Sequence, residues 1–130
     1  MTVFPDPEAA VVTFLNTRLT NAALPARAST RVPNPRPASF VTVNRVGGSL
    51  RSVAHEDAMV VVECWDASSV SASTLARKVA SWLVELDQGG SHVPQGPAGW
   101  VGRPAYLEDP VAQVPRYVMT VIVRSRIQEA

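Results

Sequence analysis

Apolar residues recur at helical spacing in two stretches of the chain. In the first stretch they fall at positions i, i+3, i+4 and i+8, which places them in one stripe along a helix. Asp6 is a favourable N-cap for this helix and Pro7 suits its first turn, while Asn21 and Pro25 mark its end. The stripe consists of Val11, Phe14, Leu15 and Leu19.

The second stretch has the clearest helical pattern in the sequence. Its apolar residues fall at i, i+4, i+7, i+8 and i+11, and charged or polar residues fill the other face. Ser71 or Ser73 can cap its start, and Asp87–Gly90 ends it, with Gly89 or Gly90 available for a left-handed C-cap. The stripe expected to be buried is Leu75, Val79, Trp82, Leu83 and Leu86.

Four segments have the composition or the alternation of β-strands. Ala28–Val32 is short and alternating, and Phe40–Val46 is rich in β-branched residues and precedes a two-glycine turn. Ala58–Trp65 is apolar on both faces, which is typical of a central strand. Arg116–Arg126 alternates throughout, and a further short strand is expected near Trp100.

The resulting order, α-β-β-β-α-β-β, predicts an α+β fold. Two helices for four or five strands favour a mixed or antiparallel sheet with both helices packed on one face. The chain has 130 residues, 46% apolar and 18% charged, and shows no internal repeat. These values are typical of a globular chain with one core, so we expect a single domain over residues 1–130.

Charge and cysteine usage narrow the function classes. The net charge of +1 gives no electrostatic reason to expect a nucleic-acid or membrane partner. Cys64 is the only cysteine, so neither an intrachain disulfide nor a zinc cluster is expected. The longest apolar run, Ala58–Val62, is too short to span a bilayer, and the first residues do not resemble a secretory signal. We expect synthesis and folding in a cytoplasm.

Two groups of residues suggest chemistry but have simpler interpretations. Cys64 with His55 or His92 would supply a nucleophile and a base, yet Cys64 lies inside an apolar strand, where free cysteine packs as a small hydrophobe. His55, Glu56 and Asp57 suggest metal ligands, but neighbouring side chains on extended backbone diverge and no further ligands are evident. A solvated loop between strands is the favoured interpretation of these three residues.

The glycine pairs and the arginines also favour non-catalytic interpretations. Gly47-Gly48 lies between strand-like residues, which is typical of a hairpin turn, and Gln88–Ser91 lacks the lysine of a phosphate-binding loop. Between residues 27 and 51 the chain has five arginines and no acidic residue. Without a recognised nucleic-acid motif, this basic segment favours contact with an acidic protein surface. We expect no enzyme activity, no cofactor and no metal.

The tryptophans divide into two kinds. Trp65 and Trp82 fall on predicted core faces, whereas Trp100 lies in a loop rich in glycine and proline. An exposed loop tryptophan is more often a contact residue, because tryptophan and arginine are enriched in interface hot spots. The candidate interface residues are Arg45, Arg51, His55, His92, Trp100 and Arg103.

The order and spacing of weak motifs along nearly the whole chain are more specific than any single motif. The motifs are, in order, Arg36–Val43, Arg45–Gly48, Asp57-Ala58, Val60–Trp65, the serine/alanine-rich helix through Leu75–Leu83, Gly102–Tyr106, Asp109-Pro110 and Pro115–Tyr117. In this arrangement the chain resembles the tail terminator (tail completion) proteins of siphophages, especially phages of actinobacteria.

The resemblance implies a structural role in the virion. Members of the family form a ring, usually a homohexamer, at the head-proximal end of the tail tube, where the ring stops tube polymerisation and joins a head-completion or connector protein. The implied partners are further copies of the chain, the major tail tube protein and the head-completion protein. Double-stranded DNA passes through the lumen without specific binding, so we expect a neutral or acidic lining. The implied docking segments are Gly47–Asp57 and Gln88–Arg103.

Two alternatives remain open at this stage. The first is a different phage neck protein, such as a head-closure or connector-associated protein, which a gene position away from the major tail tube gene would favour. The second is a small enzyme or ligand-binding domain, which a deep polar pocket with convergent ionisable groups would favour.

Overall fold

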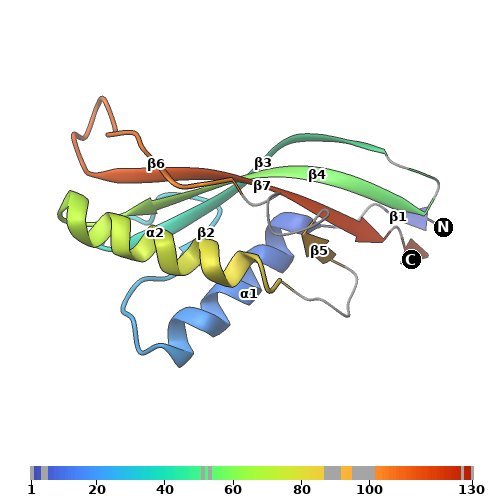
Figure 1. Cartoon of the computed structure of the whole chain (residues 1–130), viewed down its shortest axis with the longest axis horizontal. Helices are drawn as coiled ribbons and strands as arrows, with labels where there is room; N and C mark the ends of the chain where they lie inside the picture. Colours follow the sequence, from blue (N-terminus) through green and yellow to red (C-terminus); the bar gives the residue numbers. More distant parts are fainter. Residues whose placement is uncertain are drawn as a thin grey trace.

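Three long strands form the centre of the main sheet. β3 (Phe40–Leu50) pairs antiparallel with β4 (His55–Trp65), and β4 pairs antiparallel along its whole length with β7 (Arg116–Arg126). Figure 1 shows these strands as one long twisted layer. The structure is a computed structural model that describes residues 2–3, 6–50, 52, 54–86, 92–94, 102–126 and 128–129.

Short strands complete the sheet at its two edges. β2 (Ala28–Ser29) runs parallel to β3, while β5 (His92–Pro94) and β6 (Ala105–Tyr106) both pair antiparallel with β7. The strand order is therefore β2-β3-β4-β7-β5, with β6 also beside β7, which makes the sheet mixed. β1 (Thr2–Val3) and β8 (Gln128–Glu129) form a separate antiparallel pair.

Both helices lie on one face of the sheet (Figure 1). α1 (Pro7–Asn21) packs mainly on β3, and α2 (Ser69–Leu83) packs on β4 and β7. Asp6 caps α1 as predicted, with its side chain accepting a hydrogen bond from the amide of Ala9 at 3.1 Å. The α+β class, the element order and the one-sided helix cover predicted from the sequence are confirmed.

The core fills the space between the helices and the sheet. Alternate residues of β4 and β7 point toward the helices, so Val60, Val62, Val121 and Val123 are fully buried there. The predicted stripe of α1 is also buried, except for Phe14, which is half-buried at its margin. The position of β4 between β3 and β7 confirms that Ala58–Trp65 belongs to a central strand.

The bounds of α2 differ from the prediction at both ends. Ser68, not Ser71 or Ser73, is the N-cap: its hydroxyl accepts the Ser71 amide at 3.1 Å, and the Ser71 side chain reaches back to the Ser68 backbone. The helix ends at Leu83 because Val84 already forms the C-cap, and residues 87–90 lie outside the described residues. Trp82 is half-buried at the edge of the stripe rather than in its centre.

The prediction of a turn at Gly47-Gly48 was wrong. β3 continues through both glycines to Leu50, and a register shift between Arg45 and Gly47 marks an irregularity inside the strand. Gly48 has φ +133° and its backbone approaches Asp57 so closely that a Cβ would meet the carbonyl oxygen at 2.3 Å. A glycine at position 48 therefore allows β3 and β4 to approach each other closely. The chain reverses only beyond Leu50.

β2 is shorter than predicted and depends on a side chain of α1. Asn16 accepts a hydrogen bond from the Ala28 amide at 2.7 Å and donates to the Ala28 carbonyl at 3.0 Å. These two hydrogen bonds hold the two residues of β2 beside β3, and the predicted extension of the strand to Val32 does not form. The strand predicted near Trp100 lies outside the described residues.

Candidate interaction surfaces

The predicted interface residues that the structure describes are spread across the width of the sheet. Arg45 lies on β3, at one edge of the sheet, while Arg103 is exposed beside the opposite edge, on the segment that precedes β6. His55 is the half-buried first residue of β4, and His92 lies in β5 opposite Ser125. The remaining two residues, Arg51 and Trp100, lie outside the described residues.

Arg45 makes its polar contacts within the chain. Its guanidinium donates to Glu56 Oε1 at 2.8 Å and to the Gly47 carbonyl at 3.1 Å, and its backbone amide donates to Glu8 Oε2 at 2.6 Å. Glu56 is buried, so the ion pair compensates a carboxylate that has lost its hydration. Arg45 thus has a structural role that its sequence position did not indicate.

The segment His55–Asp57 is the start of β4, not the solvated loop predicted from the sequence. Glu56 points toward the helices and pairs with Arg45, whereas Asp57 points to the opposite face and pairs with Arg124 at 3.0 Å. The alternating strand geometry keeps the two carboxylates on different faces of the sheet. In the part of the chain that the structure describes, no cluster of three or more His, Cys, Asp or Glu side chains is placed to hold a metal ion.

Cys64 is fully buried on the helix side of β4. Loss of hydration, and secondarily the charge of Glu63, raises the pKa of its thiol far above the ordinary value. A thiol held protonated in the core is a poor nucleophile. Its position agrees with the interpretation of Cys64 as a small core residue.

The face of the sheet away from the helices, here called the open face, carries a row of ion pairs. Arg116 on β7 bonds Glu63 on β4 at 2.8 Å, and Glu63 also accepts the Thr42 hydroxyl at 3.3 Å. Arg124 and Asp57 form a second pair further along the same two strands. These cross-strand pairs are partly shielded from water and fix the register of β4 against β7.

An aromatic and cationic cluster occupies one end of the open face. Trp65 is buried, but on this face and not in the helix-side core that the sequence pattern predicted. Its ring stacks on Phe40 at 5.2 Å, and the guanidinium carbons of Arg36 and Arg116 lie 5.0 and 5.1 Å from its centroid. Both cations thus shield the indole, although its Nε1 has no hydrogen-bond partner among the residues that the structure describes.

A hairpin formed by β6, the turn after it and the start of β7 rises above the open face (Figure 1). We call residues 106–111 the knob. Tyr106 and Leu107 are about half exposed, and Val111 is 91% exposed. Glu108 is exposed beside them. The knob therefore presents apolar side chains together with an acidic group.

The knob is held in place by hydrogen bonds despite its exposure. The Leu107 amide donates to the Arg116 carbonyl at 2.8 Å, and Arg116 Nε donates back to the Leu107 carbonyl at 2.8 Å. Asp109 acts as a turn residue, because its carboxylate accepts the amides of Val111 at 2.9 Å and Ala112 at 3.3 Å. Such a fixed projection loses little conformational entropy on docking.

A groove with a cavity volume of about 550 Å³ runs along α2 on the helix side of the sheet. Three chain segments meet there: the turn after α1, the residues before β3, and a segment from Asp66 to Lys78 that includes most of α2. Val70 on its rim is 75% exposed, and Lys78, the only lysine in the chain, lines its far end. Its lining includes the apolar residues Leu24, Pro25, Ala38, Val70 and Leu75 together with Lys78.

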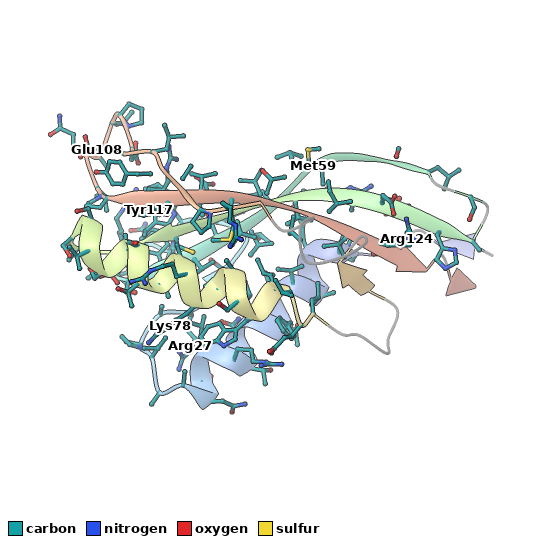
Figure 2. All side chains as sticks on the ribbon, viewed as in Figure 1. Arg27, Met59, Lys78, Glu108, Tyr117 and Arg124 are labelled. Carbon is teal, nitrogen blue, oxygen red and sulfur yellow. The ribbon has the colours of Figure 1, made fainter. Side chains whose placement is uncertain are left out.

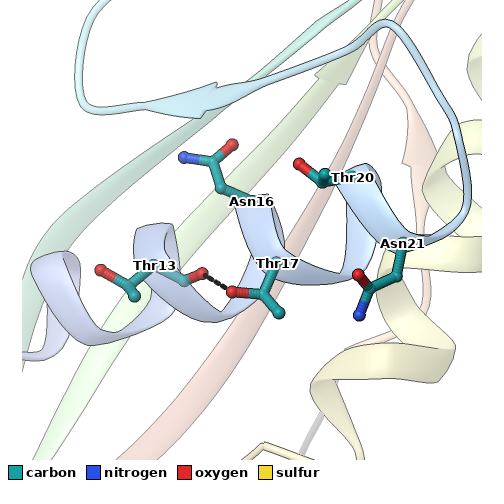
Figure 3. A pocket seen from close by; sticks show the side chains of 5 residues that line it. All are labelled: Thr13, Asn16, Thr17, Thr20 and Asn21. Carbon is teal, nitrogen blue, oxygen red and sulfur yellow. Dashed lines mark hydrogen bonds between the residues drawn. The ribbon is translucent and has the colours of Figure 1, made fainter.

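A second hollow, of about 460 Å³, lies along α1 (Figure 3). Its lining consists of Thr13, Asn16, Thr17, Thr20 and Asn21. Thr17 donates its hydroxyl to the Thr13 carbonyl at 3.1 Å, and Asn16 already holds β2. Hydroxyl and amide side chains without an ionisable neighbour offer no general acid or base, so this hollow suggests no chemistry.

No motif in the sequence marks Val70, Lys78 or Val111 as contact residues. Val111 directly follows Asp109-Pro110, a pair typical of turns, so an apolar residue beside such a pair was the available signal. The groove had no such signal, because its lining is drawn from three separate segments of the chain, within residues 24–26, 38–39 and 66–78.

No protein-family model matches the chain, and no curated protein matches it in sequence. Across the described residues, the helices are too short or too polar to cross a membrane.

Proposed function

We propose that this protein is a ring-forming structural subunit of a phage virion, of the tail terminator kind. Copies would assemble head to tail into a ring on the head-proximal end of the tail tube, halt its polymerisation and present a surface to the head-completion protein. The six-subunit stoichiometry, the virion location and the non-specific passage of DNA rest on the resemblance described above and belong to this proposal.

The observation that carries the proposal is the presence of two different exposed apolar surfaces on one small chain. The knob stands on the open face and the groove lies on the helix side, so the two cannot meet within one molecule. A closed ring needs two distinct patches per subunit, one for each neighbour. Apolar side chains exposed together in this way are typical of contact surfaces.

The described ionisable groups support a structural role over a catalytic one. The acidic residues on the sheet are engaged with arginines across neighbouring strands: Glu56 with Arg45, Glu63 with Arg116, and Asp57 with Arg124. Groups that satisfy one another in this way stabilise the strands rather than act on a substrate. We accordingly propose that the protein is not an enzyme.

The test is assembly with the tail tube. The purified protein is measured by native mass spectrometry and electron microscopy, alone and mixed with the major tail tube protein of the same phage. A ring of the chain on one end of each tube, with tubes of limited length, is the expected result. Tubes that grow without limit and carry no bound chain would contradict the proposal.

A ligand-binding domain is the second candidate, and the groove is the observation that favours it. Its volume lies in the range of small-molecule sites, and Lys78 would bind an anionic group. Binding of small carboxylates or phosphates to the unassembled chain, lost on Lys78→Glu, would favour this candidate. A different neck protein would instead bind the connector and not the tube.

A further inference from the structure

We infer that the knob of one copy docks into the α2 groove of the next copy. This inference rests on the proposed ring function and names the contact that would build it. The occupant of the groove is therefore a second copy of this chain, and the contact is between two different surfaces of identical subunits.

The two surfaces match in apolar character. Among the described residues, Val111 on the knob and Val70 on the groove rim are the two most exposed large apolar side chains, at 91% and 75%. Leu107 on the knob is also more than half exposed. The groove offers Leu24, Pro25, Ala38 and Leu75 as the apolar lining that would cover these side chains. Burying them together removes apolar surface from water on both copies.

The two surfaces also match in charge. The knob carries Glu108, which is exposed and, at 3.4 Å, accepts a hydrogen bond from the Tyr106 hydroxyl. Lys78 is exposed at the end of the groove, and Arg27 is exposed beside it, bonded to the carbonyls of Leu24 and Ala26, two residues that line the groove. Asp66 lies at the other end, before α2 begins, and the helix from Ser69 to Lys78 alone advances by roughly 14 Å. An acidic knob therefore fits the groove in one orientation, with Glu108 toward Lys78.

The positions of the two surfaces require a head-to-tail contact. Figure 2 shows Glu108 above the sheet and Lys78 below it, on opposite faces at the same end of the molecule. The sheet and α2 separate them, so Glu108 cannot reach the Lys78 of its own chain. A copy that receives a knob in its groove still presents its own knob on the other face. The contact thus propagates from copy to copy and closes where the rotation allows.

The experiment reverses the charge of Glu108 in one variant and of Lys78 in another, and then mixes the two variants. Where position 108 of one copy meets position 78 of the next, Glu108→Lys places two cations together and Lys78→Glu places two carboxylates together, so each variant alone opposes like charges at that point. We expect each variant alone to weaken self-association by about tenfold, because an attractive exposed pair becomes a repulsive one. Mixed in equal amounts, the two variants should assemble as the wild type does, since every junction in an alternating assembly again joins opposite charges.

The matched control is Arg77→Glu, which makes the same charge change on the same helix one residue away, outside the groove. It should leave assembly unchanged. Assembly is read by native mass spectrometry and on tail tubes, with circular dichroism to verify that each variant is folded.

The outcomes separate the contact from the function. Wild-type rings together with a mixture that stays dissociated, or with single variants that assemble normally, would overturn the knob and groove contact and leave the ring function standing. An equal loss in Arg77→Glu would also overturn the contact, because a general charge effect would then explain the result. A wild-type chain that forms no ring alone or on tubes refutes the proposed function, and the contact with it.

Discussion

Alanine at Gly48 and at Gly47 should differ in cost, although both glycines have positive φ. Gly47 has φ +152° and Gly48 has φ +133°, so either substitution forces a side chain into backbone that favours glycine, at roughly 1–3 kcal/mol. A Cβ on Gly47 meets nothing within 4 Å. A Cβ on Gly48 meets Asp57 O at 2.3 Å and Ala58 Cα at 2.8 Å, and both are backbone atoms that cannot turn aside.

The extra cost at Gly48 is that of forcing an atom into packed backbone, roughly 1–3 kcal/mol. Gly48→Ala should therefore lose more free energy of unfolding than Gly47→Ala by about that amount. Urea unfolding followed by circular dichroism measures both, with equal m-values as the sign that two-state comparison holds. Equal losses would refute the reasoning, because they are the result expected if both glycines formed the tip of a tight turn.

Three further predictions concern the core, the thiol and the knob. Leu83→Ala should lower the free energy of unfolding by roughly 2–5 kcal/mol, and by more than Trp82→Ala does, since only Leu83 is fully buried. If chemical denaturation shows a larger loss for Trp82→Ala, the face of α2 that packs on the sheet is not the one described. Cys64 should resist a thiol reagent at about pH 8 in the native protein and react once the chain unfolds, because burial raises its thiol pKa; rapid native labelling would contradict this. Bonding chiefly from the Val111 amide lowers the pKa of Asp109 below 3.8, so its contribution to the turn is complete above that pH and lost as the pH falls through the lower value. The Val111 amide shift in an NMR titration should report a midpoint below pH 3.8, and a higher midpoint would contradict the predicted stabilisation by Asp109.

Periodicity predicted the elements whose burial is one-sided and regular. Arg116–Arg126 has both bounds as predicted, because its alternation persists over its whole length against a buried and an open face. The start of β4 was not predicted because Glu56 is a charged residue that is buried. Its ion pair with Arg45 makes that burial possible, and a pattern of apolar residues does not show such a pair. The start of α2 was ambiguous for another reason. Several serines can cap a helix, and the reciprocal bonds with Ser71 select Ser68.

The interaction surfaces were less predictable than the fold. A sequence pattern records which residues avoid water along one element, whereas the groove exists only where the turn after α1, the residues before β3 and α2 come together. Trp65 shows the same limit. Its apolar character predicted burial correctly, but arginines from elsewhere in the chain, and not the helices, cover it.

The pairing of β1 with β8 brings the two ends of the described chain side by side, with Thr2 opposite Glu129. Figure 1 shows these ends at the opposite end of the sheet from the hairpin. A fluorescent donor fused to one end and an acceptor to the other would therefore transfer energy within a single copy, and would report its folding whether or not it assembles. Labels at this corner also stay clear of both the knob and the groove, so tagged and untagged subunits can be mixed to count the copies in one particle.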